Sequence, residues 1–138
     1  MTVVSKLLRT ETEGHGEIVD LTAGLRSILS DGGVKDGLMS VFAIGSTVAI
    51  TTMEYELGAK QDLTGLLERL IPARDDYEHN RLNGDTNGYA HMRAAVIGPS
   101  ETIPFVGGEL ALGTWQQVVL VDFDDRPRQR TVAVHLVS

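Results

Sequence analysis

The order of its strand and helix patterns constrains the fold of this 138-residue chain more than any other feature. Segments in which apolar residues alternate with polar ones, or run continuously between turn residues, are typical of β-strands. Strands are predicted at residues 3–11, 17–21, 38–44, 48–52, 90–97, 102–106, 114–123 and 129–137. A doubly wound parallel sheet would need a helix after nearly every strand, and the helix patterns here are too few. We therefore predict an α+β fold, a single compact domain over residues 1–138 with a largely antiparallel sheet or sandwich.

Two segments show the apolar spacing of an amphipathic helix, so about two main helices are expected. The first begins at Thr22, whose hydroxyl can cap it, and ends at residues 31–33, which include two glycines. The second begins at Asp62, carries leucines at helical spacing and stops before Pro72. The continuous apolar run 38–44 is predicted to be a strand that is buried on both faces.

The composition excludes several classes of function. The chain has no cysteine, so it forms no disulfides or thiolate metal sites and has no cysteine nucleophile. Its formal net charge of -7 disfavours a nucleic-acid partner, because binding to a phosphate backbone needs a basic surface. No apolar run approaches the roughly 20 residues of a membrane helix, and residues 1–13 lack the layout of a secretory signal. We therefore expect a cytoplasmic protein that binds neither nucleic acid nor membrane.

The polar stretch 77–91 is the first candidate for function, because it holds two of the four histidines. Imidazole can ligate a metal, carry a proton or hold an anion. If residues 90–97 form a strand, alternation puts His91 and Arg93 on one face, where they could bind a phosphate or a carboxylate. Asn87, just upstream, would help to form a turn. The competing interpretation is a solvated loop with a surface histidine.

A metal site is a second hypothesis for the same region. His79, His91, Glu54 and Asp85 are side chains of the types that surround zinc or another divalent ion such as magnesium. Their spacing matches no compact metal-binding motif, so the fold would have to bring them together. The alternatives are an ion with a purely structural role and no metal at all.

Other segments carry further candidate side chains. Glu54 follows a threonine-rich strand and could act as a general base or a ligand, or simply be solvated. Trp115, the single tryptophan, could wall a pocket, lie at a subunit interface or belong to the core. Arg128 and Arg130 would share one face of the last strand, where they could bind phosphate or pair with the many acidic groups.

Four blocks of sequence carry a resemblance to a known family. They are residues 45–54, 77–80 with 84–91, 98–100 with 103–104, and 112–117 continuing to 126–128. They span nearly the whole chain, and the Gly-Thr-Trp-Gln run combined with the histidine stretch is specific. On these blocks the chain resembles the YjbQ-like family, which is labelled secondary thiamine-phosphate synthase. The chain departs from the commoner family pattern at Gly45, Met53 and Tyr89, where many members have histidine, asparagine and histidine.

The resemblance implies a compact α+β domain that assembles as a homotrimer. It implies a pocket formed by the histidine stretch and the tryptophan block, within one subunit or between subunits. It also implies a weak transferase activity that joins a pyrimidine diphosphate to a thiazole phosphate and releases pyrophosphate. The family's motif positions fall in this chain on His79, Asn87, His91, Glu54, Trp115, Gln116 and Arg128.

These positions suggest a division of roles in the implied reaction. His91, Arg93 and Arg128 would stabilise the charge of the departing diphosphate, helped by a divalent ion if one binds. Glu54 and His79 would orient ligands or move protons. The remaining positions, which would contact the substrate, are Asn87, Trp115 and Gln116. The alternative function is a non-enzymatic homotrimer that binds a small anion, a metabolite or a metal ion.

Overall fold

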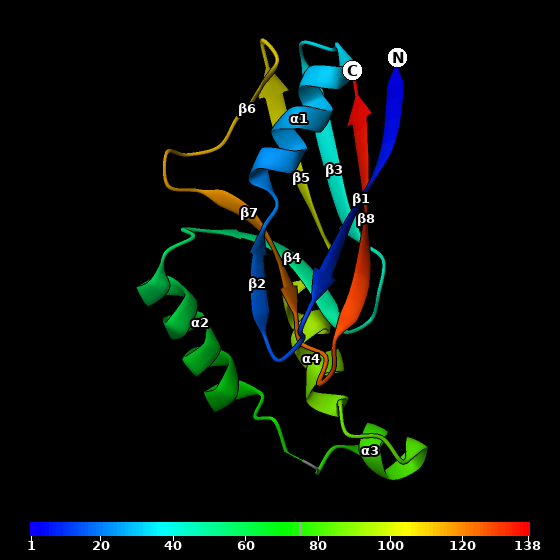
Figure 1. Ribbon diagram of the computed structural model, residues 1–138, viewed down its shortest axis with the longest axis vertical. Coiled ribbons are helices and arrows are strands. Elements are labelled where there is room, and N and C mark those ends of the chain that lie inside the picture. The colour runs from blue at the N-terminus through cyan, green and yellow to red at the C-terminus, as the bar shows by residue number, and fades with distance from the viewer. Residues whose placement is uncertain (75) are drawn as a thin grey trace.

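Two antiparallel sheets and four helices make up the structure, a computed structural model that describes residues 1–74 and 76–138 (Figure 1). The larger sheet has the order β1-β8-β3-β5-β6 and the smaller sheet the order β2-β7-β4. The strands of the larger sheet are β1 (Val3–Thr12), β8 (Arg128–Val137), β3 (Gly37–Ala43), β5 (Ser100–Val106) and β6 (Glu109–Leu110). Those of the smaller sheet are β2 (Glu17–Asp20), β7 (Gln117–Asp122) and β4 (Val48–Met53). The helices are α1 (Thr22–Gly32), α2 (Leu57–Leu70), α3 (Glu78–Asn83) and α4 (Gly88–Ile97). The predicted α+β class with antiparallel sheets is confirmed.

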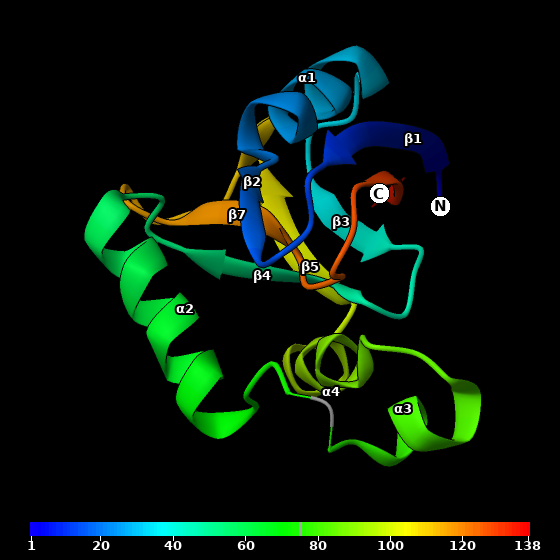
Figure 2. The ribbon, with the colours of Figure 1, turned by 60° about the horizontal axis from the view of Figure 1, so that its bottom comes forward.

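The smaller sheet is the middle layer of the molecule, and apolar side chains cover both of its faces. On one face, Ile50 and Leu120 pack with Leu25 of α1 and with the inner face of the larger sheet. On the other face, Ala49 and Val121 pack against α2 and α4. Figure 2 shows α1 and β1 on one side of β4 and α2 and α4 on the other. This double burial explains why residues 118–122 of β7 are consecutively buried.

The larger sheet, in contrast, is covered on its inner face only. Met39 and Val41 of β3 are fully buried, whereas Leu38 and Phe42 are 49% and 43% exposed. The prediction that 38–44 is buried on both faces is therefore wrong for the single chain, because none of the elements that the structure describes packs on the outer side of β3. In the register, Leu38 lies beside Val137 and Phe42 beside Ala133, which pair onward with Val3 and Leu7 of β1. The exposed apolar residues of this outer face include Val3, Leu7, Leu38 and Phe42.

The segment 90–97 is helical, so the prediction of a strand there is wrong. The alternation of Met92, Ala94 and Val96 suggests a strand, but three of the eight residues are alanine, which has the highest helix propensity. Ala90 and Ala94 lie one turn apart and are both buried in the cluster that joins α4 to the smaller sheet. Their small side chains allow α4 to lie close to β4. Much of the rest of the polar stretch is also helical, since residues 78–83 form α3 rather than a loop.

The first two helices are capped differently from the prediction. α1 begins at Thr22, but the Thr22 hydroxyl accepts a hydrogen bond from the backbone N–H of Val118 at 2.9 Å, which ties α1 to β7. α2 begins at Leu57 rather than Asp62, because the carboxylate of Glu56 accepts hydrogen bonds from the first N–H groups of the helix. Within residues 1–74 and 76–138, no helix is long and apolar enough to cross a membrane.

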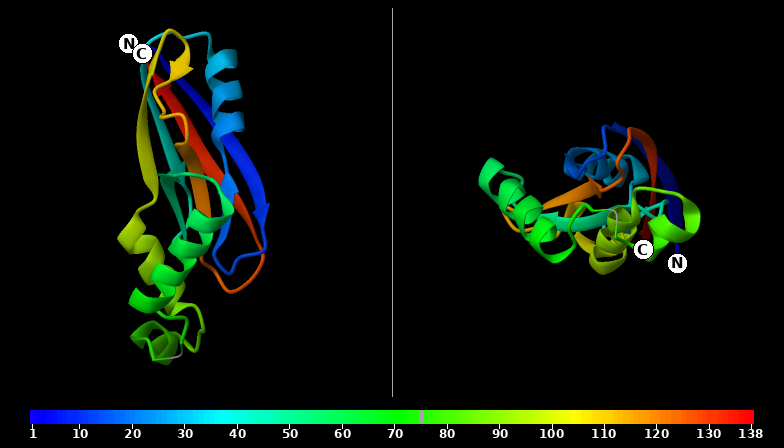
Figure 3. Two further views of the ribbon diagram at one scale, coloured as in Figure 1. Left: turned by 90° about the vertical axis from the view of Figure 1, so that its left-hand side faces the viewer. Right: turned by 90° about the horizontal axis from the view of Figure 1, so that it is seen from below.

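The two chain ends lie side by side at the end of the molecule opposite α3 (Figure 3). The backbone N–H of Thr2 donates to the Ser138 carbonyl at 2.8 Å, and Ser138 returns a bond to Thr2 at 3.0 Å. The long antiparallel pair of β1 and β8 carries the chain from these ends toward α3 and α4. The candidate site lies at the far end of this pair, where β8 begins.

Candidate functional site

The two histidines of the polar stretch meet at one end of the smaller sheet. His79 lies in α3 and His91 in the first turn of α4, and their ring centroids are 4.4 Å apart with the planes at 46°. The two helices approach closely at Gly88, where a Cβ atom would lie only 2.6 Å from the Cβ of Tyr77. Asn80 holds this approach, because its Oδ1 accepts a hydrogen bond from the Gly88 N–H at 2.9 Å.

Asn87 joins His79 to a buried carboxylate. Asn87 Oδ1 lies 3.1 Å from His79 Nε2, and Asn87 Nδ2 donates to Asp124 Oδ1 at 3.3 Å. Because the amide nitrogen faces the carboxylate, Asn87 Oδ1 has to accept from the imidazole, and we assign a proton to Nε2 on that basis. In the tautomer that carries this proton, Nδ1 is the acceptor nitrogen. The chain Asp124–Asn87–His79 thus fixes both the orientation and the tautomer of the ring.

Asp124 is 1% exposed and lies in the loop between β7 and β8. Besides Asn87, it accepts hydrogen bonds from Thr47 at 3.0 Å, from Arg128 Nε at 2.9 Å and from the Asp125 backbone N–H at 2.8 Å. Burial by itself raises the pKa of Asp124, but these hydrogen bonds outweigh burial and lower the pKa to about 2. Asp124 is therefore ionised at neutral pH and holds the surrounding donors in place.

A second buried ion pair lies beside Asp124. The side chain of Arg130 is 9% exposed, and its Nε and Nη2 each donate to one oxygen of Asp122 at 2.7 Å. Nη2 also donates to Thr47 Oγ1 at 2.7 Å, and Thr12 donates to Asp122 at 2.5 Å. Of the two fates predicted for Arg130, pairing with acidic groups is the one that the structure shows.

The charges around the histidines are nearly balanced. The acidic residues of this region are Asp85, Asp122, Asp124 and Asp125, and the arginines that contact them are Arg126, Arg128 and Arg130. Arg126 and Arg128 are the accessible ones, with 47% and 41% of their side chains exposed. The region therefore has little uncompensated positive charge for an anion.

A cavity of about 350 Å³ opens beside His91. Its lining comes from the start of β4, from α4 and from the turn before β5, and consists of Gly45, Ser46, Val48, His91, Met92, Ala94, Ala95 and Pro99. Burial, followed by the charge of nearby His79, lowers the pKa of His91. The imidazole is therefore neutral at physiological pH. A neutral histidine beside a mostly apolar cavity can donate a hydrogen bond to a bound small molecule or exchange a proton with it.

Arg93 does not belong to this site, so the predicted His91–Arg93 anion site is wrong. Residues two apart on a helix point in different directions, whereas on a strand they would share a face. Arg93 is 6% exposed, and its guanidinium donates to Glu68 at 2.8 Å and to the carbonyl of Ile71 at 2.9 Å. Tyr89 is also a core residue, with its ring centroid 5.1 Å from the Arg93 guanidinium carbon. Both side chains join α4 to the body of the protein.

Glu54, Trp115 and Gln116 lie at the other end of the smaller sheet. β4 pairs with β7 so that Val48 is beside Asp122 at the histidine end and the opposite end carries the tryptophan block. Six residues of strand separate the two ends by roughly 17–20 Å. Trp115 is 72% exposed and shares a cleft of about 300 Å³ with Glu54, while Gln116 Nε2 donates to the Thr52 hydroxyl at 3.0 Å. One chain therefore does not join these residues and the histidines in a single pocket.

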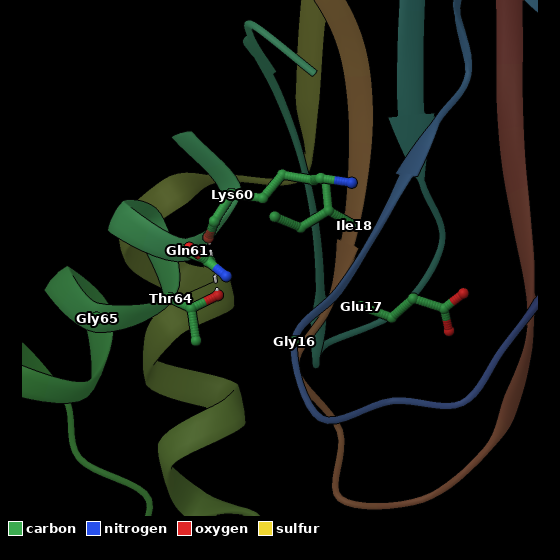
Figure 4. Close-up of a pocket in the computed structure, with 7 residues that line it drawn as sticks. All are labelled: Gly16, Glu17, Ile18, Lys60, Gln61, Thr64 and Gly65. Atoms are coloured by element: carbon green, nitrogen blue, oxygen red, sulfur yellow. Dashed lines mark hydrogen bonds between the residues drawn. The ribbon is translucent and has the colours of Figure 1, made fainter. Parts of the chain in front are cut away.

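A larger hollow of about 540 Å³ lies between β2 and α2 (Figure 4). It is lined by Gly16, Glu17, Ile18, Lys60, Gln61, Thr64 and Gly65. Its charged groups do not converge, since Figure 4 shows the Glu17 carboxylate directed away from α2. The Lys60 ammonium lies 4.1 Å from the centroid of the Tyr55 ring. Its larger volume alone therefore does not make this hollow a better candidate for the functional site than the cavity beside His91.

The donor set around the histidines does not by itself fit a resident zinc or magnesium ion. In the described ranges, no three histidine, aspartate or glutamate side chains converge to hold a metal. Asp85 lies 3.7 Å from His79 Nε2, but that nitrogen faces Asn87. Glu54 lies at the far end of the sheet. Zinc sites in proteins use three or four such ligands. We therefore assign the chemistry of this site to the protein's own side chains.

The acids that organise the site carry no recognisable motif. Asp122 ends a strand, and residues 124–127 have the composition of a turn. One signal could have indicated them: the acids at 122, 124 and 125 lie at the end of a buried strand and just beyond it, with arginines at 126, 128 and 130. Ionised residues next to a buried strand need partners, which such an arrangement supplies.

The fold is that of a small α+β domain, and comparison with known proteins shows the family to which the chain belongs. The family described as UPF0047 protein YjbQ-like matches residues 6–138. A UPF0047 protein of Methanothermobacter thermautotrophicus is 34% identical over 138 residues, which cover 100% of this chain and 94% of the relative. One of Archaeoglobus fulgidus is 36% identical over 127 residues, which cover 92% of this chain and 96% of the relative. The chain belongs to the UPF0047 YjbQ-like family, as the resemblance of its motifs predicts.

Solved structures agree with this assignment. A hypothetical protein from Aeropyrum pernix K1 superposes with a TM-score of 0.91 at 32% identity, covering 98% of both chains. A YbjQ-like protein of unknown function from Sulfolobus solfataricus P2 superposes with a TM-score of 0.88 at 27% identity, again covering 98% of both chains. The two-sheet arrangement is therefore common to this chain and its relatives.

Proposed function

We propose that this protein is a transferase of the secondary thiamine-phosphate synthase type. The reaction joins a pyrimidine diphosphate to a thiazole phosphate. The C–O bond between the pyrimidine methylene and the diphosphate breaks, and its electron pair leaves with pyrophosphate. The thiazole nitrogen forms the new bond to the methylene carbon. The observation that supports this proposal is the neutral, half-buried His91 beside a mostly apolar cavity of about 350 Å³, within the roughly 300–1,000 Å³ range of small-molecule sites.

The side chains around the cavity supply complementary roles in this reaction. His91 donates a hydrogen bond to the oxygen on which negative charge develops. His79, oriented through Asn87, offers Nδ1 to the amino group of the pyrimidine. The half-exposed Arg126 and Arg128 contact the diphosphate in place of the excluded Arg93. Each arginine also faces a carboxylate, so the binding of a highly charged diphosphate is expected to be weak.

The proposal is tested by incubating the purified protein with the pyrimidine diphosphate and the thiazole phosphate. The expected result is the release of pyrophosphate together with thiamine phosphate in equal amounts, only when both substrates are present. Binding of the pyrimidine diphosphate without any turnover would instead support the second candidate, a non-enzymatic protein that binds a small metabolite. The near balance of charge around the histidines is the observation that favours this second candidate.

A homotrimer is part of the proposal, because the outer face of the larger sheet is apolar and uncovered. A strand that is apolar on both faces, such as β3, is ordinarily buried on both, and a neighbouring copy of the chain would cover Leu38 and Phe42. Assembly could also bring the exposed Trp115 of one subunit toward the histidines of another. Such an arrangement would unite the two ends of the smaller sheet that one chain keeps apart.

Sedimentation equilibrium at micromolar concentration is expected to give three times the 14.9 kDa mass of the chain. Phe42→Glu places a charge in the proposed interface and is expected to lower the mass toward that of one chain. Leu70→Glu is the matched control, because Leu70 is 68% exposed on α2 and lies outside the outer face. A wild-type protein that sediments as a monomer would contradict the assembly.

A further inference from the structure

A cleft of about 300 Å³ lies at the end of the smaller sheet opposite the histidines. The end of β2, the connection from β4 to α2 and the connection from β6 into β7 form it. Its lining is acidic and aromatic, and consists of Asp20, Glu54, Tyr55, Glu56, Thr114, Trp115 and Gln117. None of these described residues is a lysine, an arginine or a histidine. Because roughly 17–20 Å of strand separates the cleft from the histidines, what it binds does not depend on the proposed function.

Two of the carboxylates in the cleft already serve the fold. Asp20 accepts a hydrogen bond from the Thr22 N–H at 2.9 Å, at the start of α1. Glu56 accepts one from the Gly58 N–H at 2.8 Å and caps α2. Glu54, in contrast, is exposed, and its carboxylate makes no hydrogen bond or ion pair within residues 1–74 and 76–138. Glu54 is therefore the acid that is available to a ligand, and its charge favours a cation.

Trp115 forms part of the cleft wall although 72% of its surface is exposed. The next residue, Gln116, holds the turn that carries it. Gln116 Oε1 accepts a hydrogen bond from the Gly113 N–H at 3.0 Å, and Gln116 Nε2 donates to the Thr52 hydroxyl at 3.0 Å. The indole is thus positioned before any ligand arrives. Among aromatic side chains, the face of an indole ring attracts a cation most strongly.

Tyr55 is the second aromatic ring of the cleft, and it already interacts with a cation of the chain itself. Its hydroxyl donates to the carbonyl of Ile18 at 3.2 Å, which ties the ring to β2. The Lys60 ammonium lies 4.1 Å from the centroid of this ring. Lys60 lines the hollow between β2 and α2 and not the cleft. Trp115 is therefore the ring that is left for a ligand.

The number of free acceptors decides which kind of cation fits. A primary ammonium group carries three N–H donors, which one free carboxylate does not satisfy. Among the residues that the structure describes, no group of acidic and histidine side chains converges to hold a metal ion. A quaternary ammonium group has no N–H donors, and aromatic rings recognise it through its alkyl groups. We propose that this cleft binds a small organic cation with a fully alkylated nitrogen, whose alkyl groups lie against Trp115 and whose charge faces Glu54.

Titration with choline tests the cleft, because Trp115 is the single tryptophan and its fluorescence reports on a ligand directly. At constant ionic strength, choline is expected to change the fluorescence with a saturable curve. The uncharged isostere of choline, in which a carbon atom replaces the quaternary nitrogen, is expected to bind about fivefold more weakly or not at all. Equal binding of the two compounds, or no saturable response to choline, would overturn the proposal.

Two variants separate the cleft from the overall charge of the protein. Glu54→Gln keeps the size of the side chain and is expected to weaken choline binding about fivefold. Asp31→Asn is the matched control, because it also removes one negative charge but lies near the exposed end of α1, outside the cleft. Equal weakening in both variants would show that net charge attracts choline and would overturn the proposal. Trp115→Leu, followed by calorimetry, is expected to lose most of the affinity, and wild-type affinity in this variant would also overturn it.

Discussion

His91→Ala is expected to reduce turnover of the phosphorylated pair by about 100-fold or more, with little loss of stability. The physical reason is that a hydrogen-bond donor aimed at developing charge commonly contributes two to three orders of magnitude to kcat. His91 is only partly buried, and no hydrogen bond to a described residue depends on its side chain. Steady-state rates of pyrophosphate release and chemical denaturation, measured on the same preparations, give the two quantities.

Val96→Ala provides the matched control for this prediction. Val96 lies on the same helix, is 73% exposed and does not line the cavity. Its truncation is expected to leave both the rate and the free energy of unfolding nearly unchanged. Wild-type turnover in His91→Ala would remove His91 from the reaction and with it the main support for the proposed site.

Asp124→Asn is expected to lower the free energy of unfolding by about 2–4 kcal/mol at pH 7. The variant keeps the shape of the side chain but removes the charge that holds Arg128, Thr47 and Asn87. The pKa of Asp124 is lowered from 3.8 to about 2 in the folded protein. Its ionisation therefore stabilises the fold fully above pH 3.8, and this contribution is lost as the pH falls through about 2.

The measurement is urea denaturation at a series of pH values. The difference between wild type and Asp124→Asn is expected to be constant at neutral pH and to shrink between about pH 4 and pH 2. Asp31→Asn is the control, because Asp31 is exposed near the end of α1 and is expected to change stability by less than about 0.5 kcal/mol. A difference for Asp124→Asn that is equally small, or that grows with acid, would show that Asp124 does not organise this end of the sheet.

The strands could be predicted from sequence because their patterns are local. The predicted run 114–123 contains β7, whose residues 118–122 are continuously buried because the strand lies between two layers. In the sequence, this position appears as the unbroken apolar run 118–121. The segment 90–97 could not be assigned in this way. Its apolar residues fit a period of two as well as a helical face, and the decision depends on how closely Ala90 and Ala94 approach β4, which is a tertiary contact.

The candidate site was predictable in its histidines but not in its arrangement. His79, His91 and Asn87 stand out as polar residues in one stretch, and the structure brings all three together. The sequence patterns did not single out Asp124 and left two alternative roles for Arg130, because the importance of both comes from burial beside residues that are far away in the chain, such as Thr47. The role of Arg93 was misassigned because residues 90–97 were predicted to be a strand. In the helix that these residues form, the side chains of His91 and Arg93 point in different directions.

The cavity between Gly45 and His91 is the central claim, and a crystal structure of the protein soaked with the aminopyrimidine alcohol, the pyrimidine substrate without its diphosphate, tests it most directly. The account predicts electron density for the ring inside this cavity, with a polar atom of the ring within hydrogen-bond distance of the His91 imidazole. A ring bound instead in the cleft of Glu54 and Trp115, or a cavity that stays empty at saturating concentration of the alcohol, would contradict the account.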